Sequence, residues 1–393
     1  MSHAPPRSTP PRRGWDTLRR TRRARPIEWL AERGIFLVSL SAILMVFLIF
    51  VFVAKEAMPV ALGRTDNSKA VLVRPVSDLE RMTPEEIMAY LDLKPKQFQQ
   101  MDRAILKELM QVKIEAAEEA PKDADAALNT TRWSLLLKPY QWKGYDQPEY
   151  IWQPVSQTPK YNLVPLILGS LKTTLVALLV AVPLALGAAL YVSQLASPRA
   201  KEWLKPAIEL LAGIPSVVLG FFALIVLASL LQGLFGYQSR LNAIVAGIAL
   251  ALAVIPVVFS IAEDALTSVP RAYTQAALAL GSSRWQAAWK IVLPAATPGV
   301  FAAIVLGFGR AIGETMIVLM ASGNASIVSA SLLDSTRSMT ASIAAELAET
   351  VFGGHHYRIL FLIGALLFLV TFLSNMTADL IIHRLKRRME GKA

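Results

Sequence analysis

The stretch VPRAYTQAALALGSSRWQAAWKIVLPAATPGV, residues 269–300, decides how the rest of this sequence is interpreted. Its first part is rich in alanine and leucine, which favour helix, so we predict a helix over residues 272–280. Gly281 follows directly and is placed to end that helix in the left-handed conformation, which glycine adopts without steric cost. The chain is therefore expected to turn sharply at Gly281.

A second short helix is predicted after this turn. Ser282 or Ser283 can cap its first turn, because a serine hydroxyl accepts a hydrogen bond from a free backbone N–H. The helix is expected to run to about Val292 and to stop at Pro294, which has no N–H to donate. Both helices are too short to cross a bilayer. We therefore predict an elbow of two short helices, residues 272–293, that is suited to docking into a groove of a partner protein.

Apolar runs flank the elbow on both sides. Crossing about 30 Å of hydrocarbon takes about 20 helical residues. Six runs reach that length, at residues 34–54, 164–192, 208–231, 241–261, 298–321 and 359–382. Of the 393 residues, 54% are hydrophobic, only 18% are charged and none is cysteine, which excludes a cytosolic globular enzyme, a disordered chain and a disulfide scaffold. The sequence predicts an all-α membrane protein with six transmembrane helices.

The basic residues orient these spans, because Lys and Arg in short loops stay on the cytoplasmic side. The segments placed inside hold 20 Lys or Arg, and the two short loops placed outside hold 3. The inside segments are the N-terminal tail 1–33, the loops 196–206 and 262–297, and the C-terminal tail 383–393. The outside loops are 232–240 and 322–358. Both termini are therefore expected in the cytoplasm, and the net charge of +11 follows from topology without nucleic acid.

One loop is much longer than the others. Residues 55–163 fall outside, between the first and second spans, and carry 15 basic and 16 acidic residues. Such a long loop crosses the membrane regardless of its charge. Residues 83–86, Thr-Pro-Glu-Glu, predict a capping box that starts a polar helix to about Glu119, with a break near Pro95. The tryptophan- and proline-rich remainder predicts ordered loop or a small sheet, so we expect a large α or α+β periplasmic insertion.

The spacing within the elbow resembles the EAA coupling motif of ABC importer permeases. That motif runs Glu-Ala-Ala, three residues, Gly, nine residues, Ile, one residue, Leu-Pro. The matching positions here are Gln275, Ala276, Ala277, Gly281, Ile291, Leu293 and Pro294. The one departure is Gln275 in place of the usual glutamate, which puts in doubt an ion pair with the ATPase but leaves the helix and its apolar contacts untouched. The resemblance implies that the elbow couples this chain to a separate ATPase.

Three further strings resemble the phosphate-specific transport permeases. They are GSLKTTLVALLVAVPLALGAALYVSQLA (169–196), ELLAGIPSVVLGFFAL (209–224) and GFGRAIGETMIVLMASGN (307–324). The last is more similar to the PstC member of that pair than to PstA. The resemblance implies a type I, MetI-like permease core over residues 164–382, and it does not account for residues 55–163. It also implies the partners: a second, PstA-like permease, two copies of a cytoplasmic ABC ATPase and a periplasmic phosphate-binding protein.

The chain lacks an ATP site of its own. A P-loop reads GxxxxGK[ST], and the only Gly-Lys pair here is Gly391-Lys392, which Ala393 follows. We therefore expect no cofactor and no enzymatic activity in this chain, with ATP and Mg bound by the partner ATPase.

Two charged residues are predicted deep in the fifth span. Arg310 and Glu314 are one helical turn apart, so they can pair, and charges within a span are costly enough to mark a candidate functional site. In one interpretation Arg310 binds the transported anion through its planar guanidinium, and Glu314 orients it. In the other the pair is structural and holds the span against a neighbour. In the phosphate permeases that the sequence resembles, this arginine and glutamate are implicated in transport.

Other residues of the spans are weaker candidates. Lys172, near the outer end of the second span, is expected either to snorkel to the interface or to attract anions at the pore mouth. Gly213, Pro215 and Gly220 in the third span, and Pro256 in the fourth, are expected to form simple kinks or the hinges of a gate.

The outer loop before the last span carries a helical apolar stripe. Met339, Ile343 and Leu347 share one face, which is expected to lie on the outer surface as a docking surface for the binding protein. His355 and His356 follow, adjacent to each other and isolated from other ligands, so no metal site is predicted.

Together these features predict half of the transmembrane pathway of an ATP-driven phosphate importer in the cell inner membrane, working by alternating access. Three alternatives stay open from the sequence. The first is an importer of another oxyanion, molybdate or sulfate. The second is a membrane sensor that uses residues 55–163, although the C-terminal tail is short for an output domain. The third is a secondary transporter, which the coupling elbow and the lack of an internal repeat disfavour.

Overall fold

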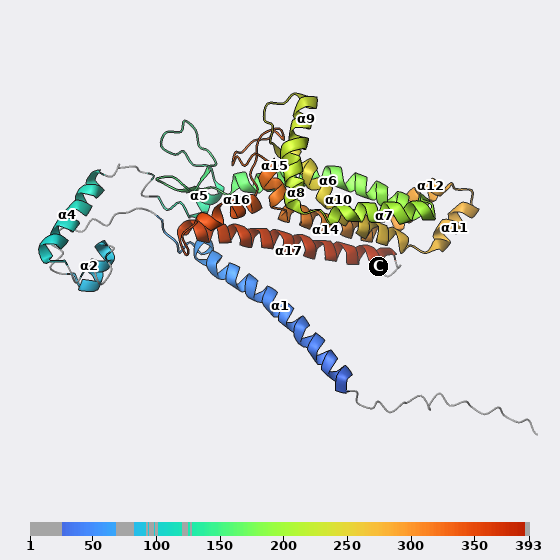
Figure 1. Cartoon of the computed structure of the whole chain (residues 1–393), viewed down its shortest axis with the longest axis horizontal. Coiled ribbons are helices and arrows are strands. Elements are labelled where there is room, and N and C mark those ends of the chain that lie inside the picture. The colour runs from blue at the N-terminus through green and yellow to red at the C-terminus, as the bar shows by residue number, and fades with distance from the viewer. Residues whose placement is uncertain are drawn as a thin grey trace, which may run out of the picture. The chain divides into compact units, whose positions relative to one another are not determined.

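The computed structural model of the protein describes residues 26–67, 82–91, 93, 98, 101–119, 125 and 128–389. Helices make up most of these residues, with a single two-stranded sheet among them (Figure 1). The chain divides into two compact units, Met1–Phe52 and Val53–Ala393. Among the described residues, five helices are long and apolar enough to cross a membrane, and a sixth span is counted if a bent pair is one span. The all-α membrane architecture is therefore confirmed.

The first unit contains most of α1 (Pro26–Ala61), and the boundary between the units falls inside this helix. Its apolar side chains from Ile35 to Phe52 are exposed, as expected of a helix that faces lipid. The hydroxyls of Ser39 and Ser41 donate to the carbonyls of Ile35 and Val38, which satisfies these polar groups within the helix itself. The predicted span 34–54 lies within α1, which continues further to Ala61.

Four long helices form the core of the second unit. They are α6 (Val164–Leu190), α10 (Ala243–Thr267), α14 (Thr297–Gly313) and α17 (His355–Met389). Helix α10 packs along both α6 and α14, and α14 also packs along α17. Two close approaches lie at Gly299 of α14, where an added Cβ would sit 2.4 Å from Ala265 Cβ of α10, and at Gly247 of α10, where it would sit 2.5 Å from Val176 Cβ of α6. Small residues thus let the helices approach closely, which is how helices associate in membranes.

The third span begins later than predicted. Residues 208–212 belong to α7 (Pro198–Ala212), and the chain breaks at Gly213–Pro215 before the apolar segment Ser216–Phe235 starts. This segment consists of α8 (Ser216–Phe222), the π-helical turn η5 (Ala223–Leu227) and α9 (Ala228–Phe235). The prediction of one span over 208–231 is wrong, because its first residues belong to α7. Helix α7 is held to α10 by an ion pair, with 2.7 Å between Lys205 Nζ and Glu263 Oε2.

The fifth span is bent at its start and interrupted near its end. The helical stretch Arg284–Ala295 meets Thr297–Gly313 at 74°. Helix α14 then ends at Gly313, and a separate short helix, α15 (Met316–Ala321), follows. The prediction of a continuous span over 298–321 is therefore wrong. Consequently Arg310 lies in the last turn of α14, and Glu314 lies in the break that follows this helix.

A second hydrophobic core lies at the end of the unit that carries α5 (Trp133–Leu137) and α16 (Met339–Glu346). Its buried members come from the end of α1, the insertion, α6, α16 and α17: Ala57, Val60, Leu136, Trp152, Tyr161, Leu163, Leu166, Met339, Ile359, Leu360, Leu362 and Ile363. Met339 is buried here, and Ile343 and Leu347 pack against the same cluster. The predicted apolar stripe therefore faces the core, and the docking surface proposed for it is wrong.

The insertion is of the α+β kind. Helix α2 (Pro84–Leu91) begins with the predicted capping box, since Thr83 N donates to Glu86 Oε2 and Glu86 N donates to Thr83 Oγ1. Helix α4 (Arg103–Glu119) ends where predicted. Strands β1 (Trp152–Gln153) and β2 (Lys160–Tyr161) pair antiparallel, with Trp152 opposite Tyr161. The predicted break near Pro95 lies outside the described residues.

Candidate functional site

The elbow has the geometry that its sequence predicts. Helix α11 (Arg271–Ala279) ends before Gly281, whose φ of 86° is left-handed. Ser283 then caps α12 (Arg284–Ala287) in a capping box: Gln286 N donates to Ser283 Oγ, and Ser283 N donates to Gln286 Oε1. Of the two serines predicted as caps, Ser283 is the one used. The local sequence alone accounts for this turn.

The second elbow helix runs further than predicted. It continues from α12 through the π-helical turn η6 (Ala288–Val292) into α13 (Leu293–Ala295), so Pro294 does not stop it. Pro294 stands in the first turn of α13, where its missing N–H is tolerated, and the wider π turn precedes it. The helix ends instead at Ala296, immediately before the 74° bend into α14.

The elbow is anchored by small buried residues and presents large exposed ones. The buried residues of the elbow are Ala277, Ala287, Ala288 and Val292. Ala288 and Val292 belong to the hydrophobic core that also contains residues of α6, α10 and α14. Of the motif positions, Gln275, Ala276, Gly281, Ile291 and Pro294 are exposed, Ala277 is buried and Leu293 is half-buried. Tyr273, Leu278, Leu280, Trp285 and Trp289 are also exposed, and Leu280 most of all, at 88%. Such a surface has the apolar anchors of a docking helix.

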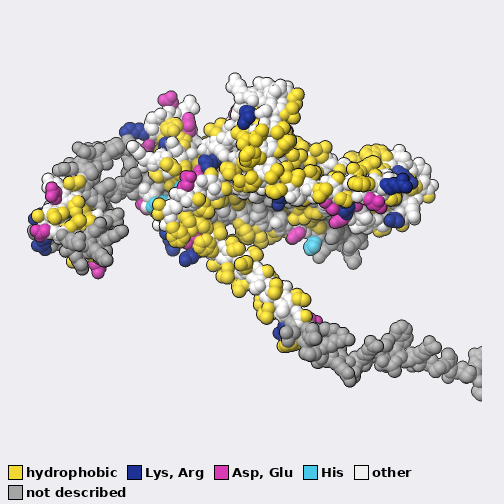
Figure 2. Space-filling model, viewed as in Figure 1, with side chains coloured by type: hydrophobic (Ala, Val, Ile, Leu, Met, Phe, Trp, Pro, Cys, Tyr) yellow, Lys and Arg dark blue, Asp and Glu magenta, His cyan; other side chains and the backbone are white. Residues whose placement is uncertain are grey.

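Two tryptophans on this surface were not predicted as site residues. Trp285 and Trp289 are one helical turn apart and stack, with ring centroids 5.9 Å apart and an angle of 18° between the planes. Their i, i+4 spacing was the available signal. Figure 2 shows Lys and Arg side chains gathered at the end of the second unit that carries the elbow, where Arg271, Arg284 and Lys290 are exposed.

Arg310 and Glu314 contact each other as predicted. Arg310 Nη2 lies 3.6 Å from Glu314 Oε2; the arginine side chain is 52% exposed and that of the glutamate 9%. Glu314 itself has left the helix: its φ and ψ of −72° and 132° are extended. The pair therefore places an exposed cation and a shielded anion at the α14–α15 break.

The break at Glu314 is stabilised from a distant element. Thr340 Oγ1 of α16 donates to the Glu314 carbonyl, with 3.0 Å between the oxygens. Gly220 of α8 lies against α15, where an added Cβ would be 2.9 Å from Met320 Sδ and 3.1 Å from the Met316 carbonyl oxygen. Backbone groups freed within a span need such partners, because lipid supplies none.

The remaining candidates are dispersed. Lys172 Nζ donates to the Ser331 carbonyl at 3.1 Å, so its ammonium ties α6 to the loop that precedes α16. Gly213 ends α7, and Pro215 stands at the N-cap of α8. Pro215 thus marks a break between two helices and does not kink one, whereas Pro256 is buried inside α10. In the part of the chain that the structure describes, neither Lys172 nor these hinge candidates form a hydrogen bond or ion pair with Arg310.

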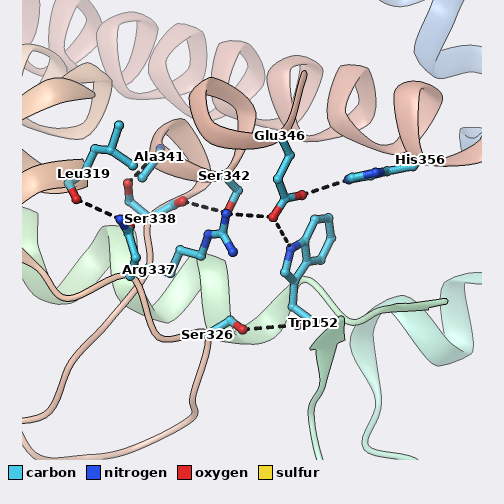
Figure 3. A network of polar contacts seen from close by, with 10 residues as sticks. Trp152, Leu319, Ser326, Arg337, Ser338, Ala341, Ser342, Glu346 and His356 are labelled. Atoms are coloured by element: carbon cyan, nitrogen blue, oxygen red, sulfur yellow. Dashed lines mark hydrogen bonds and ion pairs between the residues drawn. The ribbon is translucent and has the colours of Figure 1, made fainter. Parts of the chain in front are cut away.

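A polar network joins the insertion to the core, at the opposite end of the unit from the elbow. We call its four residues the outer network; they are Trp152, Arg337, Glu346 and His356 (Figure 3). Arg337 Nη2 and His356 Nε2 lie 2.7 and 2.8 Å from the Glu346 carboxylate, and Trp152 Nε1 donates to it at 3.0 Å. Sequence reasoning missed it, because no local pattern relates Trp152 to Glu346.

Burial alone would raise the pKa of Glu346, but its hydrogen bonds from His356 and Trp152 and the charge of Arg337 outweigh burial and hold that pKa below its ordinary value. Burial, with the nearby Glu346 charge, raises the pKa of Tyr161 to about 12. Among the described residues there is no group of three His, Cys, Asp or Glu side chains that could hold a metal ion, and His356 is engaged by Glu346.

Comparison with known proteins identifies the family. Residues 164–391 match the family described as binding-protein-dependent transport system inner membrane component. A probable ABC transporter permease protein, YqgH of Bacillus subtilis, is 36% identical over 56% of this chain and 72% of its own length. The phosphate transport system permease protein PstC of Xylella fastidiosa is 36% identical over 60% of this chain and 78% of its own.

Among solved structures, a chain of the inward-facing MetNI methionine ABC transporter aligns with a TM-score of 0.44 and 17% identity, over 57% of this chain and 95% of that one. The match to the family is the decisive finding, because it spans more than half of the sequence and includes the whole elbow. The protein therefore belongs to the family of binding-protein-dependent transport system inner membrane components, the membrane-spanning permease subunits of ABC transporters.

Proposed function

We propose that the chain is a permease subunit of an ATP-driven importer of inorganic phosphate. The observation that carries the proposal is the family match over residues 164–391, together with relatives of 31–36% identity that are named phosphate transport permeases. The exposed elbow supports it, because an import cycle driven by ATP needs a surface on which a separate ATPase can push.

The proposed assembly contains four kinds of subunit. This chain pairs with a second, homologous permease, two ATPase copies bind ATP and Mg and dock on the elbows, and a periplasmic phosphate-binding protein delivers the ion. The chain itself binds no cofactor in this scheme and performs no hydrolysis. It lies in the inner membrane with both termini in the cytoplasm, an orientation supported by the basic residues gathered at the elbow end.

The proposed substrate contact is made by Arg310. Its half-exposed guanidinium presents a planar set of donors that suits phosphate and stays charged near neutral pH. The shielded carboxylate of Glu314 orients the guanidinium and offsets its charge, so that the anion is not held too tightly to leave. A carboxylate can also accept a hydrogen bond from a protonated phosphate oxygen, whereas fully ionised sulfate can only be repelled.

Reconstitution tests this proposal. The chain, the second permease and the ATPase are placed in proteoliposomes, the phosphate-bound binding protein is added outside, and uptake of radiolabelled phosphate is followed with ATP inside. We expect uptake that needs all four proteins and ATP, and that excess sulfate or molybdate does not suppress. Uptake of molybdate or sulfate in preference to phosphate would contradict the substrate, and transport without ATPase would contradict the mechanism.

A further inference from the structure

A cleft of about 660 Å³ opens where the insertion meets the outer loop. One wall comes from the insertion and the other from a loop that follows α15. The lining residues are Tyr145, Pro148, Glu149, Tyr150, Ile151, Trp152, Gln153, Ser326, Ile327 and Val328. Of these lining residues, Ile327 is 47% exposed and Val328 is 43% exposed. Aromatic and apolar side chains with a few polar groups are the composition of a protein–protein contact.

The two walls are fixed to each other and to the core. Ser326 Oγ donates to the Trp152 carbonyl at 3.2 Å, which joins a lining residue of one wall to a lining residue of the other. The indole of the same Trp152, 4% exposed, donates to Glu346, and this carboxylate in turn holds Arg337 (Figure 3). The lining residue Trp152 is therefore connected directly to the largely shielded Arg337–Glu346 ion pair.

The loop that forms the second wall continues toward the candidate substrate site. Its Ser331 carbonyl accepts from Lys172 of α6, and Met339 N, at the start of α16, donates to Ser170 Oγ of α6 at 2.9 Å. One residue later, Thr340 caps the Glu314 carbonyl at the helix break. Hydrogen bonds made by residues 331–340 thus connect the loop of the second wall to α6 and to the backbone of Glu314.

Charge decides against a free anion as the occupant. Among the described residues, those that line the cleft include the carboxylate of Glu149 and no Lys or Arg, which disfavours binding of inorganic phosphate. The chain segment after α5, which supplies lining residues 145–153, lies at the opposite end of the unit from α11 and α12 (Figure 1). If the elbow meets the ATPase in the cytoplasm, this end faces the outside, where a family that depends on a binding protein must receive it.

We propose that this cleft is the docking site of the substrate-binding protein, and that the insertion exists to build its wall. The proposal rests on the proposed import function. A loop of the binding protein that carries apolar side chains enters between Tyr150 and Val328, with Glu149 at the rim accepting a hydrogen bond or a positive charge from the partner. Docking then acts through Trp152 and Glu346 on the outer network.

Site-specific cross-linking tests the contact in the reconstituted complex. A photoreactive benzophenone amino acid replaces Tyr150 or Val328, and another replaces Leu280 of the elbow. With the phosphate-bound binding protein present, we expect cross-links from positions 150 and 328 to that protein, and from position 280 to the ATPase. Cross-links from 150 and 328 to the second permease, to another copy of this chain or to nothing would overturn the proposal.

Uptake kinetics supply a second measurement. Val328→Arg should raise the binding-protein concentration needed for half-maximal uptake by about tenfold, because one strong interface contact is lost. Uptake at a saturating concentration of the binding protein should be unchanged. Val155→Arg is the matched control, because Val155 is 84% exposed in the same hairpin but does not line the cleft. The proposal would be overturned if Val328→Arg and Val155→Arg raised this concentration equally, or if neither raised it. If the wild type transports no phosphate, the proposed function itself fails, whereas normal transport with no cross-link refutes the docking site alone.

Discussion

Trp152 Nε1 donates a hydrogen bond of 3.0 Å to Glu346 Oε1, although 194 residues separate the two in the sequence. The same carboxylate contacts Arg337 and His356, so one half-buried side chain joins the insertion, α16 and the start of α17. Trp152 also packs in the core cluster that contains residues of α6 and α17. The part of the insertion around β1 is therefore structurally continuous with the permease.

Replacing this carboxylate by its neutral isostere should destabilise the protein. In Glu346→Gln, Arg337 keeps its charge with its side chain only 16% exposed, and its Nε already lacks a partner. Leaving one partner of such a largely shielded ion pair without its counter-charge costs up to about 3 kcal/mol. We expect a clearly lower thermal unfolding midpoint in detergent. Glu349→Gln, at an exposed position of the same segment, should change it little, and equal midpoints for both variants would show that the pair is not stabilising.

The lowered pKa of Glu346 also predicts how stability depends on pH. A carboxyl group whose pKa is lower in the folded state stabilises the fold above its ordinary value of about 4.3, and this contribution is lost as the pH falls through the lowered folded value. The difference in midpoint between wild type and Glu346→Gln should therefore shrink in acid. The midpoints are compared by thermal unfolding at a series of pH values, and a difference that grows toward low pH would contradict the direction of the pKa shift.

The close packing of α6 and α10 makes Gly247 intolerant of even one carbon. In Gly247→Ala, the new Cβ would meet Val176, which is β-branched and stiff, at 2.5 Å. The helices must separate, at a cost of about 1–3 kcal/mol. Gly187→Ala in α6 is the control, since nothing lies within 4 Å of its added Cβ, and alanine favours helix there. We expect the midpoint of thermal unfolding to be lowered in Gly247→Ala and unchanged or raised in Gly187→Ala.

The left-handed turn of the elbow should be needed for coupling. Gly281→Val forces a β-branched residue to φ of 86°, which costs about 1–2 kcal/mol and redirects the exposed elbow surface. We expect the variant to insert normally but to lose co-purifying ATPase and ATP-driven uptake. Gly233→Val, at a position without a left-handed φ or a neighbour within 4 Å, should retain both. Full coupling in Gly281→Val would argue against a docking role for the turn.

The role of Arg310 can be separated from that of a structural ion pair. If the guanidinium contacts the anion, Arg310→Ala should reduce phosphate uptake by at least about tenfold, as expected for a lost charge-assisted hydrogen bond, while the complex still assembles. Arg310→Lys should retain only part of the activity, because an ammonium lacks the planar fork. Arg240→Ala, which removes an exposed arginine bonded to Ser229, is the control. Wild-type uptake in Arg310→Ala would leave the pair a purely structural role.

The elbow was predictable because its information is local. Gly281 and the Ser283–Gln286 capping box satisfy backbone groups within a few residues, so the sequence specifies the turn without help from the rest of the chain. The Arg310–Glu314 contact was predictable for the same reason, as a pair four residues apart. The helix break at Glu314 was not predictable, because it is stabilised by a hydrogen bond from the distant Thr340.

Run length, spacing and local caps are enough to predict the number and approximate places of the spans, the elbow and the family. The start of the third span, the break in the fifth and the attachment of the insertion depend on contacts between residues far apart in the chain. Lys205 meets Glu263 across 58 residues, and Trp152 meets Glu346 across 194. The physical reason is that a buried charge or a freed backbone group is stabilised only by a partner at contact distance, and folding alone brings such distant residues together.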